Sequence, residues 1–156
     1  MPPTDRMENH HWDRALDPQT VTLFLRLQWA QAESLQTMRP MLAKFDLSAT
    51  EFDVLATLRN APAPHSLTPS AIQAAVVITS GGLTKVMQQL EARALVSRQQ
   101  QTQDLRVKPV TLTATGKTLI EAAMSETVAN TGDWLRGRLS EEEIGQLTQL
   151  LARLAP

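Results

Sequence analysis

The chain has 156 residues, the size of one ordinary domain or of one domain with helical extensions, and a formal net charge of −1. It has no cysteine, which excludes disulfides, thiolate metal ligands, iron–sulfur clusters and thiol redox sensing. No apolar run approaches the ~18 residues of a membrane span and the N-terminus lacks an apolar signal core, so we expect a cytoplasmic protein with no membrane partner.

The first predicted helix is long. It begins at Asp17-Pro18 or at Thr20 and runs to about Ala43, and we expect Pro40 to kink or end it. The polar segment before it contains adjacent histidines, His10 and His11, which we interpret as solvated residues rather than as metal ligands. Neither a metal site nor a cofactor is predicted.

Capping signals divide the middle of the chain. Ser48 and Glu51 form a capping box that opens a helix to about Asn60, and two prolines then place a loop at residues 61–66. Thr68-Pro69 begins a short helix to about Val76. A β-branched run interrupts it, and Ser80 is expected to cap the next helix, which ends near Arg93.

Two short strands follow, at 95–100 and 106–112, joined by a polar hairpin tip. Thr113 then caps a long helix to about Arg138, and Ser140 with Glu143 caps a terminal helix. The apolar stripes of the long outer helices have no sheet to cover. We therefore expect these helices to pack on each other and on a second copy of the chain.

The helix at 80–93 has two chemically different faces. Leu83, Val86, Met87 and Leu90 fall at the spacing of a buried stripe, whereas the opposite face carries Gly81, Thr84, Lys85 and Gln88. That outer face offers open backbone, a hydroxyl, a cation and an amide, with no acid and no bulky apolar group. Such groups suit the major groove of DNA, although an ordinary surface helix has a similar face.

The distribution of charge favours the same region. Residues 66–112 carry five basic and two acidic residues, a net +3, and the remainder carries ten basic and fourteen acidic residues, a net −4. A basic middle between acidic flanks is typical of a polyanion-binding face, and chance clustering is the alternative.

Several segments together resemble the MarR family. They are LSATEFDVLATL at 47–58, LTPSAI from 67, TSGGLTKVMQQLEARALV from 79, DLR from 104 and VTLTATGKTLIEA from 110, and the resemblance covers about residues 20–140. It implies a mainly α fold with a small β-hairpin wing, in which 47–112 form a winged helix-turn-helix DNA-binding domain and 1–46 with 113–156 form a helical dimerisation region. The DNA-binding residues that it implies are Ser80, Gly81, Gly82, Thr84, Lys85, Gln88, Asp104 and Arg106.

In that family the wing places an arginine in the minor groove, braced by an aspartate, and these are Arg106 and Asp104 here. A simple hairpin ion pair is the alternative. Three departures bear on DNA affinity: Leu105 stands at the wing tip where relatives carry a basic residue, Ala94 replaces the glycine after the recognition helix, and Gln73 aligns where a small residue marks the helix crossing.

The resemblance also implies a small-molecule effector. One branch, responsive to urate and related aromatic acids, uses an N-terminal Trp and an Asp that match Trp12 and Asp53. Val86 stands where that branch has an arginine, which argues against urate, and Arg26, Arg39 or Arg14 are the alternative partners for a carboxylate. Packing by Trp12 and capping or ion pairing by Asp53 are the simpler interpretations.

We therefore predict a homodimeric DNA-binding transcriptional regulator, acting as a repressor, whose affinity for an operator in double-stranded DNA responds to a small ligand such as an aromatic acid. No nucleophile–base pair, phosphate loop or zinc motif indicates an enzyme. The alternative is a helical dimer that binds ligands or proteins and has weak or lost DNA binding.

Overall fold

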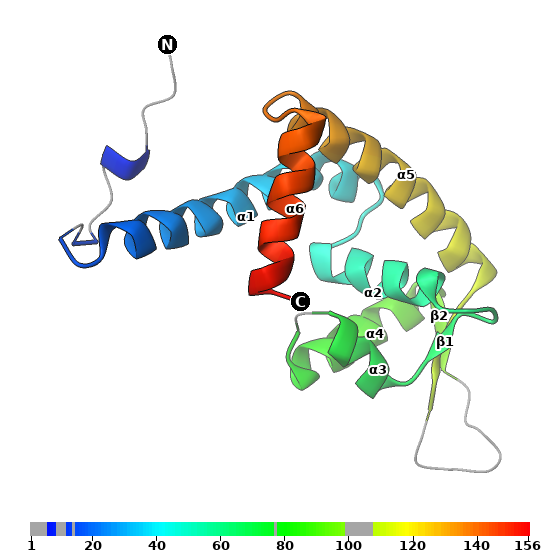
Figure 1. Ribbon diagram of the computed structural model, residues 1–156. Coiled ribbons are helices and arrows are strands. Elements are labelled where there is room, and N and C mark those ends of the chain that lie inside the picture. Colours follow the sequence, from blue (N-terminus) through cyan, green and yellow to red (C-terminus); the bar gives the residue numbers. More distant parts are fainter. Residues whose placement is uncertain (1–5, 9–11, 14, 77, 99–107) are drawn as a thin grey trace. The chain divides into compact units, whose positions relative to one another are not determined.

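The computed structural model describes residues 6–8, 12, 13, 15–76, 78–98 and 108–156. The elements of Figure 1 are η1 (Arg6–Glu8), α1 (Pro18–Lys44), α2 (Ala49–Asn60), β1 (Ser66–Leu67), α3 (Pro69–Ala75), α4 (Ser80–Ala92), β2 (Val96–Arg98), β3 (Val110–Leu112), α5 (Ala114–Arg136) and α6 (Glu141–Leu154). The predicted fold class, mainly helical with a small β wing, is confirmed. The chain divides into two compact units, residues 1–37 and residues 38–156.

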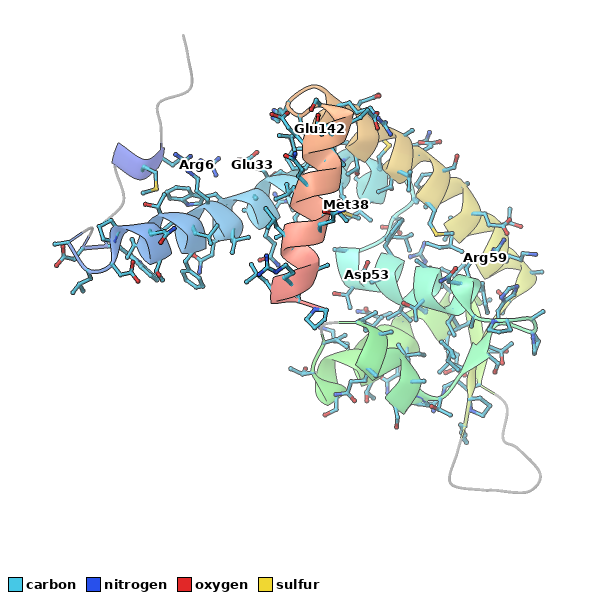
Figure 2. The ribbon with its side chains drawn as sticks, viewed as in Figure 1. Arg6, Glu33, Met38, Asp53, Arg59 and Glu142 are labelled. Carbon is cyan, nitrogen blue, oxygen red and sulfur yellow. The ribbon has the colours of Figure 1, made fainter. Side chains whose placement is uncertain are left out.

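The first unit is built on the N-terminal part of α1. Met7 of η1 is buried against Val21 and Leu25, and Trp29 packs beside them. An ion pair joins Arg6 of η1 to Glu33 of α1 (Figure 2). The short η1 segment is thus held to α1 by both apolar and ionic contacts.

The second unit holds the main core. Its side chains come from α2, α3, α4, the sheet and one face of α5, which lie around one another in Figure 1. The largest fully buried side chains are Leu55, Leu58, Ile72, Leu90, Ile120, Val54, Val96 and Val110. Burying aliphatic groups of this size stabilises a fold by about 1.5–3 kcal/mol each.

The sheet has three antiparallel strands in the order β1-β3-β2. Val96 pairs with Leu112 and Arg98 with Val110, as a hairpin requires. Strands β2 and β3 lie within the predicted 95–100 and 106–112, of which residues 99, 100, 106 and 107 are outside the described residues. Strand β1 was not predicted: Ser66 pairs with Thr111, and their hydroxyl oxygens lie 2.8 Å apart. Strand β1 thus attaches the loop after α2 to strand β3 at the base of the wing.

Most predicted helix starts are confirmed. Ser48, Thr68, Thr113 and Ser140 all accept from a backbone amide three residues on, and Ser48 and Ser140 sit in complete capping boxes. One predicted cap was wrong: the cap of α4 is Thr79, not Ser80. Pro40 does not end α1, which continues to Lys44, one residue beyond the predicted end at Ala43.

The outer helices leave many apolar side chains in solvent. Helix α6 buries none of its residues, although its apolar positions follow helical spacing. Leu150 is 56% exposed and Leu154 64% exposed. In the first unit Leu23, Phe24 and Leu35 are also exposed. Among the described residues, no helix is both long and apolar enough to cross a membrane.

Candidate nucleic-acid interface

Helix α4 separates its two faces as its sequence predicts. Leu83, Val86, Met87 and Leu90 are buried in the core of the second unit. Gly81, Thr84, Lys85 and Gln88 are all exposed. The Thr84 hydroxyl donates to the carbonyl of Ser80 at 3.1 Å and keeps its lone pairs for an outside donor. The polar face is therefore open along the helix.

The two glycines at the start of α4, Gly81 and Gly82, lie in different surroundings. A methyl group on Gly81 would meet nothing within 4 Å, so that position is open surface. A methyl group on Gly82 would lie 3.0 Å from the Thr79 hydroxyl and 3.2 Å from Ile78, and the Gly82 amide donates to that hydroxyl at 3.1 Å. Gly82 is half-buried, so packing around the cap explains it without a DNA contact.

The residues that follow α4 pack against the start of α5. Ala94 has φ of 57°, the left-handed conformation that its place after the helix predicts, which costs about 1–2 kcal/mol without glycine. The Thr113 hydroxyl lies 2.7 Å from the carbonyl oxygen of Ala94 and 3.0 Å from that of Leu95. A methyl group on Gly116 would come within 2.0 Å of the Leu95 carbonyl oxygen. The chain after α4 and the start of α5 therefore touch backbone to backbone.

The sequence also singled out Gln73 on α3 and the residues of the wing tip. Gln73 on α3 is exposed, whereas its neighbour Ile72 is fully buried in the core of the second unit. The wing-tip residues Asp104, Leu105 and Arg106 lie outside the described residues. At the base of the wing, Arg98 donates to the Lys108 carbonyl at 2.9 Å, and its Nε is buried with no partner within the described parts of the chain.

The candidate effector residues belong to both units. In the first, Trp12 stacks on Phe24 with ring centroids 5.4 Å apart, and Arg26 is exposed. In the second, Asp53 is exposed near the start of α2 (Figure 2), and partial burial raises the pKa of its carboxyl group. Among the described residues, no three His, Asp or Glu side chains gather as metal ligands would.

Comparison with known proteins decides the family. The model of the MarR family matches residues 47–108. The regulator PecS of Dickeya dadantii (strain 3937), described as an HTH-type transcriptional regulator, is 39% identical over 114 residues, covering 73% of this chain and 68% of PecS. The chain belongs to the MarR family. It is thus a DNA-binding transcriptional regulator with a winged helix-turn-helix.

Two solved structures of other proteins share the fold. The S. aureus MepR–DNA complex is 26% identical, with a TM-score of 0.74 over 83% of this chain and 93% of MepR. Bordetella bronchiseptica BpsR, whose DNA binding is regulated by 6-hydroxynicotinic acid, is 23% identical, with a TM-score of 0.77 over 86% of this chain and 99% of BpsR. The likeness to BpsR establishes the fold alone.

Proposed function

We propose that this MarR-family chain acts as a homodimeric repressor whose affinity for operator DNA is lowered by a small aromatic acid. The observation that carries DNA reading is the open polar face of α4, with Gly81, Thr84, Lys85 and Gln88 exposed over a fully buried inner stripe. Ser80 is exposed beside them, and Gly82 acts through the cap. Lys85 meets phosphate or a base edge, and Gln88 reads an edge in the major groove.

The proposed dimer is built from residues 1–46 and 113–156, around the DNA-binding residues 47–112. Its support is the unburied stripe of α6, because a helix with a wide apolar face is stable in water only when something covers it. Two recognition helices then stand about 34–36 Å apart, one turn of DNA. In the wing, Arg106 enters the minor groove and Asp104 orients it.

The proposed effector changes that spacing. A ligand lowers DNA affinity only by binding the DNA-incompetent spacing more tightly than the competent one. Trp12 and Asp53 are the proposed contacts, with Arg26 for the carboxylate. An aromatic acid suits an aromatic surface beside a cation, and 6-hydroxynicotinic acid, which regulates BpsR, belongs to this chemical class.

The test is binding to duplex DNA from the region upstream of the chain's own gene, measured by anisotropy over a series of salt concentrations. Lys85→Ala should weaken binding and lower the slope of log K against log salt by about one. The matched control is Lys117→Ala, an exposed lysine on α5 that should leave the slope unchanged. An unchanged slope in Lys85→Ala would remove Lys85 from the phosphate contacts.

The same assay separates the alternative. A dimer with lost DNA binding would show no salt-dependent binding at all, while still responding to the ligand. Arg106→Ala should reduce the preference for A·T-rich flanks, and an equal loss on all flanks would argue for a nonspecific role. Adding 6-hydroxynicotinic acid and related aromatic acids to the wild-type complex then tests the effector class.

A further inference from the structure

Helices α1 and α4 end in the same way and close to each other. After α1, the amide of Asp46 donates to the Ala43 carbonyl at 3.1 Å and that of Leu47 to the Leu42 carbonyl at 2.9 Å, with φ of 51° at Asp46. This is a Schellman motif. After α4, the amides of Ala94 and Leu95 make the same two bonds, to Glu91 at 2.9 Å and to Leu90 at 3.0 Å.

Arg93 spans these two helix ends. It is the C-cap residue of α4, and its Nη1 donates to the carbonyl of Asp46 at 2.5 Å. Its Nη2 lies 3.4 Å from the carbonyl oxygen of Phe45. Nη1 also lies 3.6 Å from a carboxylate oxygen of Glu51 on α2. One side chain of the recognition helix thus contacts both sides of the corner between α1 and α2.

The electrostatics of this corner favour a guanidinium. Carbonyl oxygens at a helix C-terminus carry partial negative charge, and the Glu51 carboxylate adds a full one. Glu51 is itself fixed, since its other role is to accept from the Ser48 amide at 3.1 Å in the capping box of α2. A planar guanidinium reaches several acceptors at once in a fixed geometry, which a lysine ammonium does not do.

The contact is better suited to positioning than to stability. The Arg93 side chain is 34% exposed and the Glu51 side chain 13% exposed, and at 3.6 Å their charged atoms are too far apart for a strong hydrogen bond, so the pair contributes little to folding. The contact matters more for the orientation of α4, because this helix has 13 residues and is about 20 Å long, so a small tilt at one end moves the other end far. A tilt of about 10° at its C-terminal end would move the Ser80 end by about 3 Å, a full hydrogen-bond length.

We propose that Arg93 is a positioning residue, which sets the orientation of α4 for DNA reading by tying its end to the corner of α1 and α2. The inference rests on the proposed function of α4. It adds a route for regulation: a ligand that moves the end of α1 shifts the DNA-reading face through the Arg93 contacts. Arg93 itself touches no DNA in this arrangement.

The experiment compares Arg93→Ala with Arg59→Ala in the full chain. Arg59, labelled in Figure 2, is a close match because its side chain is similarly exposed. It pairs with Glu121 at 2.6 Å and so joins α2 to α5. Arg93→Ala should weaken binding to the upstream duplex about tenfold, with the salt slope of the wild type, and Arg59→Ala should bind as the wild type does. Arg93→Lys should not restore binding.

Three results would overturn the inference: Arg93→Ala binding within twofold of the wild type, a slope lowered by about one, or an equal loss in Arg59→Ala. If Arg93→Ala does not fold, Glu51→Gln replaces it, since glutamine keeps the capping box but removes the charge, and a loss of affinity is again expected. Hydrogen exchange of α4 without DNA should be faster in Arg93→Ala only. That readout stands even if the wild type binds no DNA, a result that would defeat the proposed function alone.

Discussion

Helices α4 and α6 both carry an apolar stripe, but only α4 buries it. The four apolar residues of the α4 stripe lie in the core, and its polar face is open. Helix α6 is as well capped, yet none of its residues is buried. The comparison indicates which surface of each helix is free for a partner: α4 offers polar groups suited to nucleic acid, and α6 offers an aliphatic strip suited to another protein surface.

The largest expected effect on stability comes from adding a methyl group to Gly116, which packs against the chain after α4, with Gly145 in α6 as the comparison. Gly116→Ala places Cβ 2.0 Å from the Leu95 carbonyl oxygen, so the backbone behind α4 must move, and we expect a loss of about 3 kcal/mol in the free energy of unfolding. Gly145→Ala in α6 meets nothing within 4 Å and should stabilise by about 0.5–1 kcal/mol. Urea unfolding measures both. Similar losses in the two variants would remove the contrast between the regions.

The next effect tests the apolar face of α6. Leu147→Glu puts a charge on that face and should weaken self-association by about 2 kcal/mol, close to 30-fold in the dissociation constant. Sedimentation over a range of concentrations measures it. Gln149→Glu, also exposed on α6, is the control and should associate as the wild type does. A wild-type dissociation constant for Leu147→Glu would mean that α6 is not in the interface.

The helix caps and the two faces of α4 could be predicted from local sequence. Caps at Ser48, Thr68, Thr113 and Ser140 follow from residues three apart, so they were predictable. The inward and outward faces of α4 follow from its periodicity in the same way. The start of α4 was misplaced by one residue because Thr79 and Ser80 both offer a hydroxyl for the cap.

Contacts between distant residues were not predictable from the sequence. Strand β1 is two residues long and pairs with β3, 45 positions further on, so it has no periodicity to detect. Arg93 looked like the ordinary end of a helix, since its acceptors Asp46 and Phe45 lie 47 and 48 positions away. The wing tip lies outside the described residues, so its role rests on the resemblance alone.

A smaller effect concerns the residue after α4. Ala94 is exposed with φ of 57°, so Ala94→Gly relieves a backbone strain of about 1–2 kcal/mol. Glycine loses about 0.5–1 kcal/mol more conformational freedom on folding. The free energy of unfolding should therefore rise by about 0.5–1 kcal/mol, or Tm by about 2 °C. Ala92→Gly, inside the helix, should instead lower stability by about 0.5–1 kcal/mol. Calorimetry distinguishes the two signs. Destabilisation by both glycines would show that Ala94 is not strained.

The smallest effect lies at Asp53 on α2, whose side chain is exposed but whose carboxyl group is partly buried. Because burial raises the pKa of this carboxyl group, its ionised form disfavours the folded state, and the folded state is relatively most stable below the unfolded pKa. Stability should fall as pH rises through the folded pKa, so Asp53→Asn should stabilise slightly at neutral pH and have no effect in acid. Asp133→Asn, an exposed acid of α5, is the control. A gain confined to low pH would contradict the sign, whereas a gain that grows when an aromatic acid is bound would mean that the ligand covers Asp53.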